Sequence, residues 1–316
     1  MATSGSVDFS LTRDNIVKAA FQKIGIVGEG LAPTADQYTE GSLLLNAIVK
    51  SWNASLGMPL WAMKVGYILP VSGTSSVSLG PSGGHATLAY VSTTLNAAHI
   101  ATDTALTVAS ITGISASDNL GIELDNGEID WTTVNGAPSG TTVTATTGLT
   151  TAASSGNRVY TYTTKLARPL RIIKAFTRVQ SDTTDTPVEM ITSNSYLELS
   201  SKTTESWPTQ MWYDPQLTEG IASFWPRFVD GTRIIVIHFH RPLEDFDATG
   251  DNPDFPQEYY LPLIYELAVN LAPQYAVPLD QWKILTAQAK RWLDMVGNND
   301  YEEGSILFTP DLTRYS

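Results

Sequence analysis

Apolar residues recur at helical spacing between residues 254 and 297. Leu263, Leu267 and Leu271 repeat every four residues, which places their side chains on one face of a helix. Pro273 ends this pattern, because the residue before a proline avoids the helical region of backbone space. The pattern therefore predicts a helix with one buried stripe, in need of apolar partners from elsewhere in the chain.

A second amphipathic helix is predicted to begin near Pro278. Gly297 follows its last apolar residue and is expected to end the helix as a left-handed cap. Its apolar positions, which fall on one side at helical spacing, are Trp282, Leu285, Ala289, Trp292 and Val296.

The other strongly helical sequence lies near the N-terminus. Thr12 can cap a helix that runs to Gly25. Thr34 and Gln37 have the spacing of a capping box and open a further helix that ends at Gly57. Because all four amphipathic helices need apolar partners, the two ends of the chain are expected to meet.

Between these ends the pattern changes to short strands separated by turn residues. Residues 233–241 carry the strongest strand signal, and the pair Asn126-Gly127 is typical of a tight hairpin turn. Residues 86–165 are rich in Thr, Ala and Gly, with strand candidates about every ten residues. This stretch is expected to form a small antiparallel module inserted into a surrounding β domain.

The predicted fold class is α+β. A four-helix unit forms from the N- and C-terminal segments, a mainly antiparallel β domain is inserted between them, and a second small β-module is nested inside that domain. The expected parts are N-terminal helices at 1–65, a β domain at 66–85 and 166–252, the inserted module at 86–165, C-terminal helices at 253–297, and an extended arm at 298–316.

Composition narrows the possible functions. The chain has 316 residues, with 32 acidic and 19 basic residues and a formal net charge of −13. Proteins that bind nucleic acid through phosphate contacts need basic surfaces, so specific DNA binding is not expected. The absence of cysteine excludes disulfides, thiol nucleophiles and cysteine zinc sites. No apolar run approaches membrane-spanning length, and the first residues lack the regions of a signal peptide.

Two stretches resemble cofactor sites only superficially. His238 and His240 share one face of a strand, with Glu244 or Asp245 nearby, but no third ligand has a recognisable spacing. The glycines at 25–30 follow a predicted helix, whereas a phosphate loop follows a strand. We interpret both stretches as structural and expect no metal and no cofactor.

The acidic run Glu123, Asp125, Glu128 and Asp130 could supply calcium ligands or a glycosidase carboxylate pair. It straddles a hairpin turn, where exposed carboxylates are common, and it lacks the ligand order of a calcium loop. We interpret it as structural and identify no catalytic residue, so the chain is not expected to be an enzyme.

Two further features favour contacts with other proteins. Trp207, Trp212 and Trp225 lie among prolines with few cations nearby, which favours core or interface packing over base or sugar stacking. The C-terminal arm has no helical period but carries large apolar side chains. They are expected to dock in a partner's groove or to add a strand to its sheet, and the alternative is an arm folded back on its own helices. These side chains are Ile306, Leu307, Phe308, Leu312 and Tyr315.

Several motifs in order along the chain resemble a known family. They are Arg168-Pro-Leu, Tyr196 with Lys202, Trp207-Pro-Thr-Gln-Met-Trp-Tyr-Asp-Pro-Gln, Trp225-Pro, Arg241-Pro-Leu-Glu-Asp-Phe-Asp and Asp254-Phe-Pro-Gln-Glu-Tyr. With the two N-terminal helices, this order resembles the head-to-tail adaptors of short-tailed bacteriophages. These are tail accessory factors related to the packaged-DNA-stabilising protein and, more distantly, to tail tubular protein A. The resemblance covers 11–70 and 166–297, and the module at 86–165 departs from the compact members.

The resemblance implies a structural protein of the virion at the head-tail junction, made in the host cytoplasm. Copies would form a homo-oligomeric ring, dodecameric in the family, beneath the portal protein. The ring would extend the DNA channel, which DNA crosses without specific binding, and would carry the next tail protein, a nozzle or tail tube. The C-terminal arm would clasp the portal, and no membrane is involved. The alternative is a tail-associated glycan-binding or cell-wall-degrading protein that uses Glu123, Glu128 and the aromatic residues of 207–226.

Overall fold

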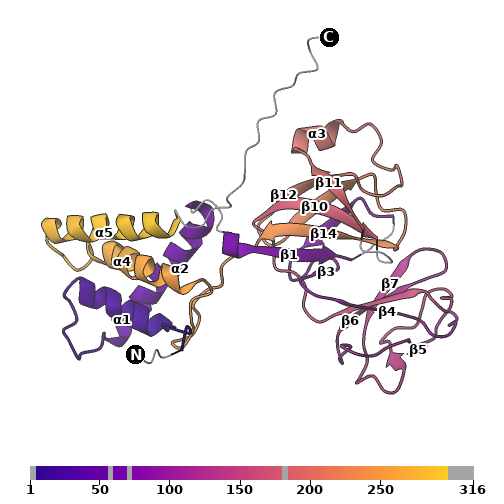
Figure 1. Ribbon diagram of the computed structural model, residues 1–316, viewed down its shortest axis with the longest axis horizontal. Coiled ribbons are helices and arrows are strands. Elements are labelled where there is room, and N and C mark those ends of the chain that lie inside the picture. The colour runs from indigo at the N-terminus through magenta and orange to yellow at the C-terminus, as the bar shows by residue number, and fades with distance from the viewer. Residues whose placement is uncertain (1–4, 56–59, 70–72, 180–183, 298–316) are drawn as a thin grey trace, which may run out of the picture. The chain divides into compact units, whose positions relative to one another are not determined.

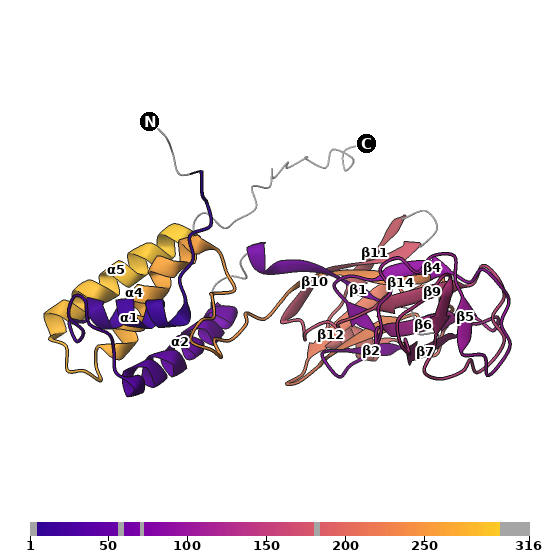
Figure 2. The same cartoon turned by 90° about the horizontal axis from the view of Figure 1, so that it is seen from below.

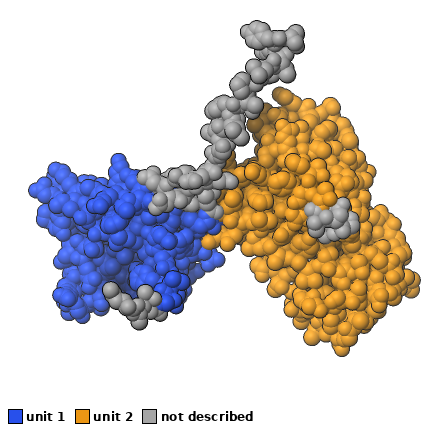
Figure 3. Space-filling model, in the orientation of Figure 1, with its two compact units in different colours: residues 1–62, 243–316 blue, residues 63–242 orange. Residues whose placement is uncertain are grey.

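The chain divides into two compact units, here called the helical unit and the β unit (Figure 3). A computed structural model describes residues 5–55, 60–69, 73–179 and 184–297. The helical unit comprises residues 1–62 and 243–316, and the β unit comprises residues 63–242. The helical unit contains α1 (Arg13–Lys23), α2 (Ala35–Ser55), η1 (Leu60–Ala62), η2 (Gln257–Tyr259), α4 (Tyr260–Leu271) and α5 (Leu279–Gly297) (Figure 1).

The starts of the first two helices follow their sequence signals. The Thr12 side chain caps α1 by accepting a bond from the Asn15 amide at 3.4 Å. The Thr34 amide donates to the Gln37 side chain at 2.8 Å, and the Gln37 amide donates to the Thr34 hydroxyl at 3.3 Å, so the predicted capping box is confirmed. The expected left-handed cap at Gly297 is wrong, because that residue is the last of α5 and its φ is not in the left-handed region.

Helix α4 lies at the centre of the helical unit and packs against α1, α2 and α5. Its stripe of Leu263, Leu267 and Leu271 is fully buried, as the four-residue repeat predicted. The surrounding helices contribute Ile16 and Leu45, among other apolar residues, to the same core.

The β unit is built on an eight-stranded sheet that nearly closes on itself. Its order is β2-β13-β12-β11-β10-β14-β1-β3, and the loop of residues 80–85 joins the two edge strands. Alternate side chains of the strands, among them Ile235, Ile237 and Phe239, fill the inner core. The strands are β1 (Met63–Ile68), β2 (Ser76–Leu79), β3 (Ala86–Thr87), β10 (Arg171–Val179), β11 (Asp185–Met190), β12 (Gln210–Pro215), β13 (Gly220–Trp225) and β14 (Arg233–His240).

The predicted fold class is wrong in its arrangement of helices and of the sheet. The described residues form a mixed α/β structure with five α-helices, and those of the helical unit pack around α4 and do not form the expected four-helix unit flanking a β domain. The fifth helix, α3 (Ser193–Glu198), lies between β11 and β12, which pair in parallel. A strand can return parallel to its predecessor only through a crossover connection, and α3 provides one. A six-residue helix is too short to show a helical period in the sequence.

Residues 91–162 form two further sheets around a separate core. One sheet has the order β4-β9-β6-β7, the other pairs β5 with β8. The Asn126-Gly127 turn joins β6 to β7, with Gly127 at φ 82°, as the dipeptide predicted. The strands are β4 (Val91–Thr94), β5 (Ala105–Thr107), β6 (Asn119–Glu123), β7 (Ile129–Thr133), β8 (Thr142–Thr144) and β9 (Arg158–Tyr162).

This module packs on the outer face of the eight-stranded sheet, beside β1, β3 and β14 (Figures 1 and 2). Tyr160 and Tyr162 of β9 share a buried cluster with Ile234 and Val236 of β14. The Tyr160 hydroxyl donates to the Gly231 carbonyl at 3.1 Å. The module is therefore held to the sheet by a buried aromatic contact.

His85, in the loop that joins the sheet edges, stacks on Trp131 of the module. The ring centroids are 3.6 Å apart, and the His85 Nδ1 bonds the Tyr162 hydroxyl at 2.8 Å. Burial, and to a smaller extent Lys165, lowers the pKa of His85 from 6.5 to about 4.

We expect the β unit to lose stability as the pH falls from 6.5 to 4, because the unfolded chain binds a proton at His85 in this window and the folded chain does not. The loss is on the order of 2 kcal/mol. His85→Gln removes the titrating group, so the pH dependence of its urea unfolding midpoint should be flatter than that of the parent chain. If the unfolding midpoints of the two proteins changed with pH in the same way, the folded chain would accept a proton at His85 as readily as the unfolded chain does. That result would contradict the lowered pKa.

Candidate functional site

The motif residues of the middle of the chain come together at one place in the β unit. Helix α3 and residues 199–207 lie against the β12–β13 hairpin, which carries two of the three tryptophans. We call this cluster the tryptophan cap: Tyr196, Lys202, Trp207, Trp212 and Trp225.

Two tryptophans of the cap share one face of the hairpin, because Trp225 pairs with Gln210 and side chains alternate along each strand. The ring of Trp212 lies 5.6 Å from that of Tyr196 on α3. The Trp225 indole donates to the Ser201 carbonyl at 2.7 Å. These contacts fix α3 and the following segment on the hairpin.

The Lys202 side chain caps the C-terminal end of α3. Its ammonium group donates to the Tyr196 carbonyl at 2.7 Å and to the Leu199 carbonyl at 3.1 Å, and it lies 4.8 Å from the centre of the Tyr196 ring. A cation is favourable here, because the last carbonyls of a helix lack partners within it. The pairing of Tyr196 with Lys202 in the sequence motif thus has a structural explanation.

Lys202→Ala is expected to destabilise the β unit by about 1–2 kcal/mol, since it removes charged hydrogen bonds to α3 carbonyls. Urea unfolding followed by tryptophan fluorescence measures the change. Lys174→Ala, an exposed lysine of β10, is the matched control and should change the midpoint little. Equal effects of the two substitutions would contradict a capping role for Lys202.

The third tryptophan is also covered by a protein group. The Arg233 guanidinium lies 4.5 Å from the centre of the Trp207 ring. All three tryptophans are half-buried, and the rings of Trp207 and Trp212 each lie against another side chain. Large apolar side chains remain exposed beside the cap, at Leu197 on α3 (65%) and at Leu217 on the hairpin tip (94%).

A hydrogen bond from Tyr213 connects the β12–β13 hairpin to the Arg168-Pro-Leu motif. Its hydroxyl donates to the Pro169 carbonyl at 2.5 Å. Burial raises the pKa of Tyr213 to about 12, so this hydroxyl remains a donor at neutral pH. Gly220 permits the contact, because a Cβ at this position would lie 2.0 Å from the Tyr213 hydroxyl oxygen.

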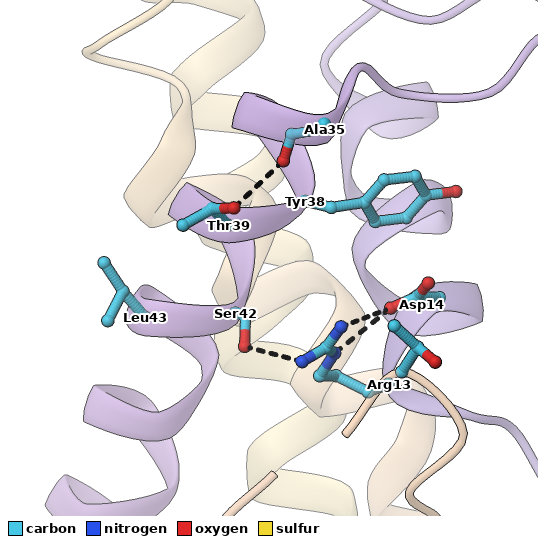
Figure 4. A pocket seen from close by; sticks show the side chains of 8 residues that line it. Arg13, Asp14, Ala35, Tyr38, Thr39, Ser42 and Leu43 are labelled. Carbon is cyan, nitrogen blue, oxygen red and sulfur yellow. Dashed lines mark hydrogen bonds and ion pairs between the residues drawn. The ribbon is translucent and has the colours of Figure 1, made fainter. Parts of the chain in front are cut away.

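The helical unit contains a pocket of about 410 Å³ between α1 and α2 (Figure 4). Arg13 lies in the pocket, bonded to Asp14 at 3.0 Å and to Ser42 at 3.4 Å. Because Asp14 already neutralises the guanidinium, the pocket has no free cation to attract an anion. Its lining residues are Arg13, Asp14, Ala35, Tyr38, Thr39, Ser42, Leu43 and Thr249.

The histidine pair does not assemble a metal site. His240 is buried on β14, and the His238 ring lies 5.8 Å from that of Phe176. Among the residues that the structure describes, no group of three or more His, Asp or Glu could hold a metal ion. Gly25 follows α1 at φ 76°, as expected for a helix cap rather than a phosphate loop.

Carboxylates of the acidic run accept hydrogen bonds from backbone amides of the inserted module. Glu123 accepts the Arg158 amide at 3.1 Å, and Asp125 accepts the Ser154 amide at 2.7 Å. Asp130 accepts the Thr150 amide at 2.6 Å. These carboxylates hold loops in place, which agrees with the structural interpretation of the run.

The expected portal-contact residues lie outside the described part of the chain: Ile306, Leu307, Phe308, Leu312 and Tyr315. Across residues 5–55, 60–69, 73–179 and 184–297, no helix has the length and apolar character needed to cross a lipid bilayer. The sequence named the tryptophans and Lys202, but it did not indicate that they share one cap.

Comparison of the chain with models of known protein families and with curated proteins finds no match.

Proposed function

We propose that this chain is the head-to-tail adaptor of a short-tailed bacteriophage. Copies form a homo-oligomeric ring beneath the portal protein, extend the DNA channel and carry the next tail protein. The proposal places the chain in the virion, at the head-tail junction. Its main support is the tryptophan cap, in which motif residues between Tyr196 and Trp225 contact one another and their neighbours.

The cap supports the proposal in a specific way. Tyr196, Lys202, Trp212, Tyr213 and Trp225 carry the resemblance, and each contacts another part of the cap or the Arg168-Pro-Leu motif. These contacts give the motif residues a common structural role within this chain, which supports the proposal. The exposed leucines beside the cap offer apolar surface for a neighbouring protein.

The distribution of charge also supports a DNA conduit. The helical unit carries 18 acidic and 8 basic residues, a formal charge of −10 out of −13 for the whole chain. A channel wall of this charge repels the phosphate backbone and lets DNA pass without binding. An adaptor of this kind needs no catalytic group and no cofactor.

Co-sedimentation with portal rings from the same genome tests the proposal. The full-length chain is expected to bind portal rings in stoichiometric amount, and a chain truncated after Asp300 is expected to bind them more weakly, because it lacks the apolar arm. Equal binding of both forms would remove the arm from the proposal. Absence of binding by the full-length chain would overturn the proposal and favour assays for glycan binding and cell-wall cleavage.

A further inference from the structure

The chain passes between the helical unit and the β unit at two places. It leaves the helical unit after Ala62 and enters β1 at Met63, and it returns to the helical unit between Pro242 and Leu243. Met63 pairs with His240 across β1 and β14, so the two crossings lie side by side. The motion that the two units can make therefore depends on how much chain each crossing leaves between firmly held residues.

The first crossing contains no spare residue. Ala62 is buried, at 4% exposure, and the ring of its neighbour Trp61 lies 5.6 Å from that of Tyr259 and 6.3 Å from that of Phe255. These rings belong to the core of the helical unit. The next residue, Met63, is already part of the β1–β14 ladder.

The second crossing is shortened by three polar side chains of α2. Asn46, Lys50 and Asn53 have the i, i+4 and i+7 spacing of one helix face. The Asn46 side chain donates to the Phe246 carbonyl at 3.2 Å and accepts from the Phe246 amide at 2.9 Å. Lys50 donates to the Leu243 carbonyl at 2.8 Å, and Asn53 accepts from the Leu243 amide at 3.4 Å. We call these three side chains the α2 clamp.

Burial and charge strengthen the hold of the clamp. Leu243 is 5% exposed and Phe246 is 3% exposed, and both belong to the core of the helical unit. Lys50 also forms an ion pair with Asp245 at 2.6 Å. The segment from Leu243 to Phe246 is therefore held along α2 by its backbone and by its side chains.

Only a short piece of backbone separates this segment from the sheet. The β14 ladder ends at His240, so the second crossing consists of Arg241 and Pro242. The ring of Pro242 fixes its own φ, and a residue that precedes a proline is also restricted. The second crossing is therefore short and stiff.

We propose that the α2 clamp sets the length of the second crossing and so restricts the two units to a bend about the line through both crossings. A hinge consists of a few residues at the ends of elements, which absorb the change in backbone angles. A single crossing would let the units twist as well as bend, whereas two adjacent short crossings oppose the twist. This inference goes beyond the proposed function, because it applies to the isolated chain.

Distances between two spin labels test the restriction, because the chain contains no cysteine. Gln281→Cys on α5 and Thr186→Cys on β11, both exposed, place one label in each unit. Inserting Gly-Ser-Gly-Ser between Arg241 and Pro242 leaves the clamp contacts in place. It should broaden the distance distribution by roughly half, because the reach of a flexible crossing grows with the square root of its length. The same insertion after Gly136, at an open turn of the module, is the matched control and should not change the width.

The triple variant Asn46→Ala/Lys50→Ala/Asn53→Ala tests the clamp itself. Alanine favours the helix, so α2 should persist, which circular dichroism checks. The distance distribution should broaden towards that of the insertion variant, and the amides of Leu243 and Phe246 should exchange hydrogen faster. A distribution identical to that of the parent chain would overturn the role of the clamp. A parent distribution as broad as that of the insertion variant would overturn the restriction, whether or not the triple variant folds.

Discussion

Leu267→Ala is expected to lower the free energy of unfolding of the helical unit by about 2–5 kcal/mol. Leu267 is fully buried on α4, the helix that contacts α1, α2 and α5. The substitution removes apolar contacts and leaves a cavity that the surrounding helices cannot fill completely. Urea unfolding followed by circular dichroism at a helical wavelength reports the change.

The matched control is Leu261→Ala on the same helix. Leu261 is 37% exposed, so its truncation should cost less than about 1 kcal/mol. A small effect at Leu267, or equal effects at both positions, would show that α4 is not the central helix of this unit.

Gly148→Ala is expected to destabilise the inserted module by about 1–3 kcal/mol. A Cβ at this position would lie 2.4 Å from the Thr102 carbonyl oxygen and 2.8 Å from the Thr102 Cα. The obstacle is backbone, which cannot rotate away as a side chain can. We expect a lower unfolding midpoint for the β unit, measured by tryptophan fluorescence.

Gly250→Ala provides the comparison, because no atom lies within 4 Å of a Cβ at that position. Replacing glycine by alanine in open space restricts the unfolded chain and is neutral or slightly stabilising. If Gly148→Ala behaved in the same way, the close approach of residues 102 and 148 would be contradicted.

Local features were predictable from the sequence because neighbouring residues determine them. The capping box of Thr34 and Gln37 and the buried stripe of α4 match their patterns, as does the turn at Gly127. Each depends on residues within a few positions of one another, so the chemistry of the side chains is sufficient.

Nonlocal features were not predictable. The parallel pairing of β11 with β12 depends on α3, whose six residues show no helical period. The near closure of the sheet depends on the pairing of β2 with β13, which joins segments far apart in sequence, and on the pairing of β3 with β1 at the other edge. The fold class was wrong for these reasons, although the strand at residues 233–241 and the Asn126-Gly127 hairpin were anticipated.

The same distinction applies to the tryptophan cap. The sequence identified Trp207, Trp212 and Trp225 as packing residues, and the structure bears this out. It did not place the Lys202 ammonium on the α3 carbonyls, because the helix itself was missed. Residues that carry a resemblance can therefore be identified before their contacts are understood.

The most direct measurement is the number of copies that bind one portal ring. Purified full-length chain is mixed with portal rings from the same genome, and the mass of the complex is determined by sedimentation and electron microscopy. An adaptor predicts one closed ring of copies stacked on the portal around a continuous channel. Free portal rings and free chain at saturating concentration, with no complex, would contradict the adaptor function.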